Sequence, residues 1–174
     1  MTSDSRSSQD QATFTTIYRE HYPQILAYLR RRVAAAVAEE YCADVFGRAW
    51  ANFSSLQDPQ RPLPWLYGIA GNVVKEYYRG KSARQDRVEE EAELDQIAAD
   101  DFSQVADLSL DINRALNALS FADRDIIALH AWEQLSIPDI AASLGITENN
   151  ARVKLHRART RLKEVLEPEN LGRS

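Results

Sequence analysis

The chain has 174 residues, with 21 lysines and arginines against 26 aspartates and glutamates, so its formal net charge is −5. Hydrophobic residues make up 44% and charged residues 27%, which excludes collagen-like and low-complexity chains and fits one large or two small globular domains. No apolar run approaches the roughly 18 residues of a membrane span, so membrane insertion is not expected. Residues 1–10 are polar and lack the apolar core of a secretory signal, which predicts a cytoplasmic protein.

Catalysis and cofactor binding find little support in the sequence. Cys42 is the single cysteine, which excludes an internal disulfide and a thiolate-rich metal site. His21, His130 and His156 lack metal-ligand spacing, and neither a Gly-rich phosphate loop nor a nucleophile motif appears. We therefore expect a protein that is not an enzyme and that uses no cofactor and no metal. Cys42 lies in an apolar stripe, which favours a buried, inert thiol over a redox sensor.

Charge is distributed unevenly along the chain. Between residues 86 and 107 there are nine acids and one base, so this segment carries −8 and leaves +3 on the rest. The acidic run also interrupts the apolar pattern, which is typical of a flexible linker. It divides the chain into an N-terminal domain at 12–85, a linker at 86–107 and a C-terminal domain at 108–167.

The N-terminal unit has the apolar spacing of three helices. Steps of three and four residues recur in the stretches 14–33, 38–53 and 65–78. Pro23 is expected to start or kink a helical segment within the first stretch. The proline-rich loop at 54–64 separates the second helix from the third. The aromatic residues on these stripes, including the tryptophans, Tyr77 and Tyr78, are expected to pack into the core.

Helix caps define a compact motif in the C-terminal unit. Ser120 or Asp123 can cap one helix, and Ser136, followed by Pro138 in the first turn, caps the next. Gly145 can adopt the left-handed backbone that ends a helix, after which Thr147 caps a long helix to about residue 164. A short helix, a Gly-containing turn and a second helix form a helix-turn-helix. The predicted fold is therefore all-α, with two small helical domains and a C-terminal helix-turn-helix.

The last predicted helix is strongly basic, with six bases and one acid between residues 147 and 163. In a helix-turn-helix the second helix enters the major groove, where its first residues contact bases and later basic residues contact phosphates. A run of charge alone usually marks a solvated face, but these bases follow a complete capped turn, which favours DNA binding. The predicted DNA-binding residues are Glu148, Asn149, Asn150, Arg152, Val153, Lys154, Arg157, Arg159 and Arg161.

The motifs resemble a known family. The runs Leu135–Ala141, Leu144–Ile146 and Arg152–Arg159 are similar to the promoter-reading domain of bacterial sigma-70 factors, most closely the two-domain extracytoplasmic-function (ECF, group 4) sigma factors. In the N-terminal half, the runs Tyr18–Pro23, Asp44–Trp50 and Pro64–Asn72 are similar to the segments with which this family binds core RNA polymerase and melts promoters. The resemblance covers both domains and leaves out only the tails and the acidic linker.

This resemblance implies a role for each polar face. The C-terminal helix-turn-helix would read the minus-35 duplex, and Asn72, Lys75, Arg79 and Arg84 would bind the minus-ten element as its strands separate. Docking on the clamp helices and flap of core RNA polymerase would involve Glu40, Asp44 and Arg48. The family also implies promoter DNA and an anti-sigma factor as partners. The chain is therefore expected to direct promoter-specific transcription initiation.

Two questions stay open at this point. A stand-alone helix-turn-helix repressor or activator, with a helical dimerisation or sensing domain, would share the C-terminal motif but would bind a palindromic duplex without polymerase. The acidic linker is expected to act as a simple tether. Alternatively, it threads through the positively charged channels of the polymerase in imitation of nucleic acid.

Overall fold

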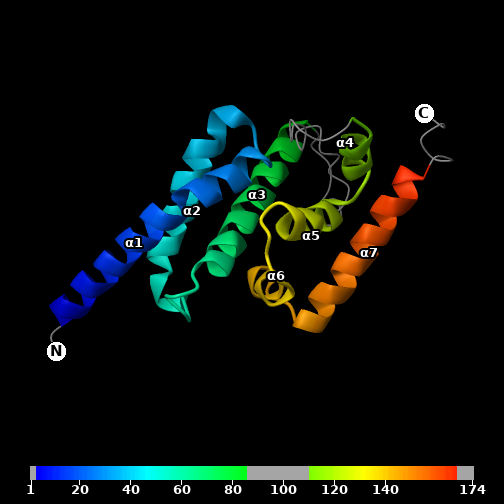
Figure 1. Ribbon diagram of the computed structural model, residues 1–174. Helices are drawn as coiled ribbons and strands as arrows, with labels where there is room; N and C mark the ends of the chain where they lie inside the picture. Colours follow the sequence, from blue (N-terminus) through cyan, green and yellow to red (C-terminus); the bar gives the residue numbers. More distant parts are fainter. Residues whose placement is uncertain (1–2, 86–109, 168–174) are drawn as a thin grey trace.

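The computed structural model describes residues 3–85 and 110–167, with side chains over 4–81 and 110–167. All regular structure in these ranges is helical and forms two helical domains, which confirms the all-α prediction (Figure 1). The predicted acidic linker at 86–107 lies outside the described residues. Among the described helices, none combines the length and the apolar character needed to cross a lipid bilayer.

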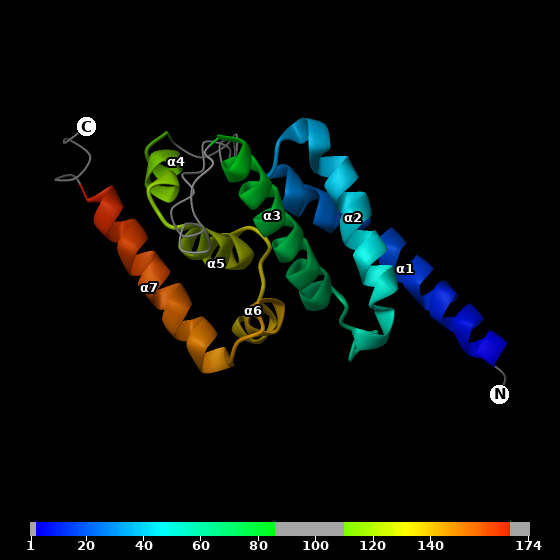
Figure 2. The same ribbon diagram turned by 180° about the vertical axis from the view of Figure 1, so that it is seen from behind.

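The first domain consists of three long helices: α1 (Ser3–Arg30), α2 (Ala38–Ala51) and α3 (Leu63–Gln85). Short 3-10 turns at Ala35–Val37 and Phe53–Ser55 precede and follow α2. Pro23 lies inside α1, so it does not start a separate helix as one of the two sequence interpretations had it. The N-terminal part of α1 projects beyond the other helices, whereas its C-terminal part packs against α2 and α3 (Figures 1 and 2).

Aromatic side chains join α1 to α2 and to the 3-10 turn that follows α2. The ring of Phe14 lies edge-on to Phe53, with centroids 5.7 Å apart, and Tyr18 meets Phe46 edge-on at 4.9 Å. Trp50 packs against Phe14 with 5.1 Å between ring centroids but remains 45% exposed. The expectation that every tryptophan lies in the core is therefore wrong for Trp50, which lies near the end of α2.

The buried thiol and the tyrosine pair of the first domain follow the sequence prediction more closely. Cys42 is fully buried, and this burial raises the pKa of its thiol to about 11. A thiol with so high a pKa stays protonated at neutral pH and is a poor nucleophile. Tyr78 is buried as expected, and Tyr77 is half-buried against the ring of Tyr41.

The second domain contains α4 (Leu110–Asn117), α5 (Phe121–Ala131), α6 (Ile137–Leu144) and α7 (Glu148–Leu166). Each predicted cap is formed by a hydroxyl that accepts a backbone N–H three residues later: Ser120 from Asp123, Ser136 from Asp139 and Thr147 from Asn150. Gly145 ends α6 with φ +66°, in the left-handed region. These caps set the turn of the helix-turn-helix, as predicted.

The two domains pack directly against one another, with α3 in the centre of the molecule (Figures 1 and 2). Helix α6 lies on α3, where the Ser143 hydroxyl donates a 3.0 Å hydrogen bond to the Pro64 carbonyl. Nearby, the ring of Tyr78 meets that of Phe121 edge-on, with 5.6 Å between centroids. One continuous hydrophobic core therefore runs through both domains, an arrangement that the sequence did not predict.

Replacing Gly145 should test the turn of the helix-turn-helix. A Cβ at this position meets nothing within 4 Å, so Gly145→Ala changes backbone strain without a steric clash. We expect the free energy of unfolding to fall by about 1 kcal/mol, because an L-residue disfavours the left-handed backbone. Gly47→Ala is the matched control: Gly47 lies within α2, also in open space, so alanine there should stabilise the protein by about 0.5–1 kcal/mol. Urea unfolding of both variants measures the difference, and equal shifts would contradict the strain argument.

Candidate nucleic-acid interface

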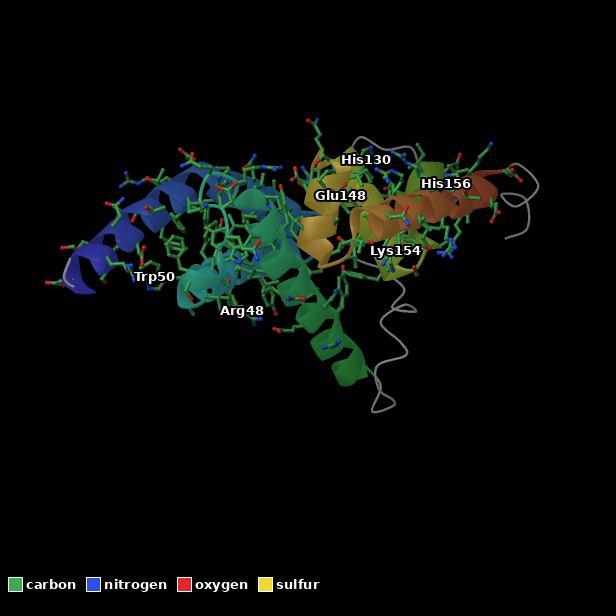
Figure 3. The ribbon with its side chains drawn as sticks, turned by 90° about the horizontal axis from the view of Figure 1, so that it is seen from below. Arg48, Trp50, His130, Glu148, Lys154 and His156 are labelled. Atoms are coloured by element: carbon green, nitrogen blue, oxygen red, sulfur yellow. The ribbon has the colours of Figure 1, made fainter. Side chains whose placement is uncertain are left out.

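Helix α7 separates an apolar side from a polar side. Ala151, Leu155 and Ala158 are buried against the rest of the second domain. The predicted DNA-binding side chains lie on the other side, and all of them are exposed except Val153, which is half-buried. Figure 3 shows Glu148 at the start of α7 and Lys154 and His156 farther along it. This side of α7 is therefore a continuous polar surface that begins at the turn of the motif.

One of the predicted phosphate ligands is already paired. The guanidinium of Arg161 donates a 2.6 Å hydrogen bond to the carboxylate of Asp123, in the first turn of α5. This bond raises the pKa of Arg161 further and anchors α7 to α5. Arg157 and Arg159 are exposed beside it. The paired Arg161 thus has a packing role within the second domain besides the DNA contact predicted for it.

The predicted minus-ten residues lie on α3, beside the junction of the domains. Asn72 and Arg79 are exposed and Lys75 is half-buried, whereas the side chain of Arg84 lies outside the described residues. Asn72 and Lys75 line a cleft of about 320 Å³ whose opposite wall comes from the second domain and includes Asp125 and Gly145. Lys75 also lines a neighbouring cleft together with Lys154 of α7. The structure therefore brings residues predicted to bind separate promoter elements close together.

The predicted polymerase-binding residues lie on α2 and differ in how they are held. Glu40 is exposed. Arg48 (Figure 3) donates a 3.1 Å hydrogen bond to Asp44 on its own helix and two, at 2.9 and 2.6 Å, to Glu76 on α3. The bond from Arg48 lowers the pKa of the Glu76 carboxyl. Arg48 therefore joins two helices, which makes it a poor position for testing partner binding by mutation.

Sequence reasoning missed an ionic cluster between the domains. Arg31 and Arg32, just after α1, meet Glu133, just after α5: Glu133 accepts hydrogen bonds from Arg31 at 2.5 Å and from Arg32 at 3.2 Å. Asp125 of α5 lies 3.4 Å from the Arg32 guanidinium, and the Tyr67 hydroxyl donates to Glu133 at 3.3 Å. We call the four charged residues the interdomain ionic cluster. About one hundred residues separate its two halves, so no local sequence signal identifies it.

Most of the interdomain ionic cluster is removed from water. The side chain of Arg32 is 0% exposed and that of Glu133 is 5% exposed. Arg32 also stacks on the ring of Tyr28 at 3.6 Å and donates to the Tyr28 carbonyl. Burial raises the pKa of the Asp125 carboxyl, although the nearby charges of Arg32 and Lys75 act in the opposite direction. The buried charge of Arg32 in the first domain and the carboxylates of the second domain therefore compensate one another.

The described residues contain no group of three or more histidines, cysteines, aspartates and glutamates that could hold a metal ion. What the structure offers instead is polar surface on helices: the exposed side of α7, the α3 face beside the interdomain cleft and the α2 face around Glu40. Exposed amide and guanidinium groups on such helices are suited to hydrogen bonds with bases and phosphates.

Comparison with known proteins finds two matching segments in the chain. Residues 17–84 match the family model for Sigma-70 region 2, and residues 109–162 match that for Sigma-70 region 4. An RNA polymerase sigma-E factor of Streptomyces avermitilis is 28% identical over 91% of this chain and 87% of its own length. The ECF RNA polymerase sigma factor SigL of Mycobacterium tuberculosis is 28% identical over 92% of this chain and 93% of its own.

Solved structures agree with the fold. The sigma factor RpoE of Bartonella quintana, in complex with the anti-sigma factor NepR, superimposes with a TM-score of 0.63 at 27% identity and covers 89% of this chain and 97% of its own. CnrH, in complex with the cytosolic domain of CnrY, superimposes with a TM-score of 0.59 at 23% identity. This second likeness concerns the fold alone. The two family matches together span more than half of the chain, and with these relatives they show that it belongs to the sigma-70 family of RNA polymerase sigma factors.

Proposed function

We propose that this sigma factor belongs to the extracytoplasmic-function group 4 and works through three surfaces. The α2 face around Glu40 and Asp44 binds the clamp helices of core RNA polymerase. The α3 face with Asn72 binds the separated strands of the minus-ten element, and α7 reads the minus-35 duplex. The domains divide at 12–85 and 108–167, and the protein works in the cytoplasm, where its polymerase is.

The observation that carries this proposal is the first half of α7. The Thr147 hydroxyl caps the start of α7 by accepting the backbone N–H of Asn150. The exposed Glu148, Asn149 and Arg152 therefore stand at the end of the helix that enters a major groove. Asparagine suits the N6 and N7 atoms of adenine, and arginine suits the O6 and N7 atoms of guanine. The basic side chains farther along α7 contact phosphates, and these contacts fix the position of the helix on the duplex.

An anti-sigma factor is the proposed regulatory partner. The sigma factor RpoE of Bartonella quintana is 27% identical to this chain, and the match covers 97% of the RpoE chain. Its structure was solved in complex with the anti-sigma factor NepR. A partner of that class would act by covering the α2, α3 or α7 surface.

Run-off transcription tests the proposal as a whole. The purified chain, combined with core RNA polymerase and a library of genomic fragments, should give transcripts from a defined set of promoters that core enzyme alone does not use. Binding of the chain to a palindromic duplex without polymerase, together with no sigma-dependent transcript, would favour a stand-alone repressor or activator instead.

Charge reversal at Glu40 should weaken polymerase binding. Glu40 is exposed and, within the described residues, forms no ion pair, so Glu40→Lys leaves the Arg48 bonds between α2 and α3 intact. We expect the affinity for core enzyme to fall about tenfold or more, because the substitution replaces a carboxylate predicted to contact the polymerase with a group of opposite charge. Asp10→Lys is the control, since Asp10 is exposed on α1 outside the region 2 match. Fluorescence anisotropy of labelled chain with core enzyme measures both, and equal affinities would remove Glu40 from the interface.

Truncation of Asn72 should impair promoter melting. The Asn72 side chain is exposed on α3, so Asn72→Ala removes a donor and an acceptor for a base edge without opening the core. We expect the permanganate reactivity of melted thymines to fall about tenfold, as follows from the loss of 1–3 kcal/mol of base contact, while polymerase binding stays unchanged. Arg79→Gln is the comparison variant: it lies at an exposed position on the same helix and removes a predicted phosphate contact instead of a base contact. Wild-type reactivity in Asn72→Ala would show that the amide does not hold a base.

A further inference from the structure

Helix α7 carries an apolar side chain in the middle of its polar surface. Val153 lies two residues from Ala151 and two from Leu155, both of which are buried in the second domain. Residues two apart on an α-helix point in nearly opposite directions, because each residue turns the helix by about 100°. Val153 therefore faces away from the core, on the side of α7 that holds the predicted DNA-binding residues.

The packing of the second domain does not use this side chain. Within the described residues, Leu162 and Val165 of α7 pack against the hydrophobic core, whereas Val153 does not. Val153 is nonetheless half-buried, because neighbours one turn away on a helix cover part of its surface. Those neighbours are exposed and polar: Asn149, Asn150, His156 and Arg157. The valine is thus a small apolar spot surrounded by hydrogen-bonding groups.

The position of Val153 separates it from an ordinary exposed apolar residue, of which every protein surface has several. It lies in the second turn of α7, which begins at Glu148. The first turns of the second helix in a helix-turn-helix are the part that contacts base edges. Valine has no hydrogen-bonding group in its side chain, so any contact that it makes with a base is apolar.

The major groove offers one apolar group to such a side chain. All base pairs present hydrogen-bond donors and acceptors there, and thymine alone adds a methyl group. If valine covered a donor or an acceptor, that group would lose its water without gaining a hydrogen bond, which costs free energy. Contact with the methyl group instead removes apolar surface of both partners from water. A T·A pair is therefore favoured over the other pairs opposite Val153.

We propose that Val153 reads a thymine methyl group in the minus-35 duplex and thereby sets a preference for T·A at one position of the promoter. This inference rests on the proposed function for its ligand, and it adds the base that one residue of α7 selects. Asn149 and Arg152, which are exposed beside Val153, form hydrogen bonds with neighbouring base pairs. Val153 contributes an apolar contact between them.

Parallel selections locate the base pair that Val153 reads. Core RNA polymerase combined with the wild-type chain or with Val153→Ser captures duplexes from a random library, and the enriched sequences are compared. We expect one thymine of the wild-type motif to lose its enrichment in Val153→Ser, because serine lacks the apolar surface, and to keep it in Val153→Ile. Thr160→Ser is the matched control: it also removes a methyl group from an exposed position of α7, about two turns farther along, and should leave the motif unchanged.

Deoxyuridine then tests the methyl group by itself, since it differs from thymidine by that group alone. It replaces the identified thymine in the selected duplex, and anisotropy of the labelled duplex measures its affinity for the holoenzyme. We expect the affinity of the wild type to fall about fourfold, as follows from burial of one methyl-sized group, and that of Val153→Ser to be the same for both duplexes. Deoxyuridine at another thymine of the motif is the control. The wild-type measurement involves no substitution in the protein, so a folding defect cannot produce the loss.

Three results would overturn the proposal. Enrichment of an identical motif by Val153→Ser would show that Val153 selects no base. An equal deoxyuridine effect in the wild type and Val153→Ser would assign the methyl contact to another side chain, and a selection without any enriched motif would show that α7 reads no sequence. The selection measures binding and not RNA synthesis. A chain that enriches the thymine motif but yields no run-off transcript would therefore count against the proposed function alone.

Discussion

The polar contact that links the two domains most closely is the buried guanidinium of Arg32 between Asp125 and Glu133. Desolvation of an ion pair offsets much of its attraction, so such a pair adds little net stability, yet removing one partner leaves an expensive buried charge. An ionic contact of this kind fixes the register of the two domains, whereas burial of the apolar side chains in their common core supplies favourable free energy.

The helix at the centre of the molecule serves both domains. One side of α3 packs against α1 and α2, and another receives α6 at Gly68, where the small residue allows the backbone of Ser143 to approach. Asn72 and Lys75 follow Gly68 by four and seven residues, spacings that place them near the same side of the helix. The surface on α3 proposed to bind the minus-ten element is thus also the surface nearest to the second domain.

Local signals in the sequence were sufficient for each domain. The hydroxyls of Ser136 and Thr147 and the left-handed Gly145 act within three or four residues, so the turn of the helix-turn-helix could be predicted from the chain alone. Arg32 and Glu133 are brought together only by tertiary packing, and in the sequence neither differs from an ordinary surface charge. Likewise, the spacing of α2 placed Arg48 on a polar face, but its bonds to Glu76 depend on how α3 lies against that face.

The charge distribution shows which basic side chains of an acidic chain are already compensated. The Asp123 carboxylate neutralises Arg161 within the second domain, whereas Arg31 is neutralised by Glu133 of the other domain. Binding of DNA releases counterions only where cations are free to meet phosphates. Arg157 and Arg159, which are exposed on α7, should therefore contribute more to the salt dependence of DNA binding than the paired Arg161.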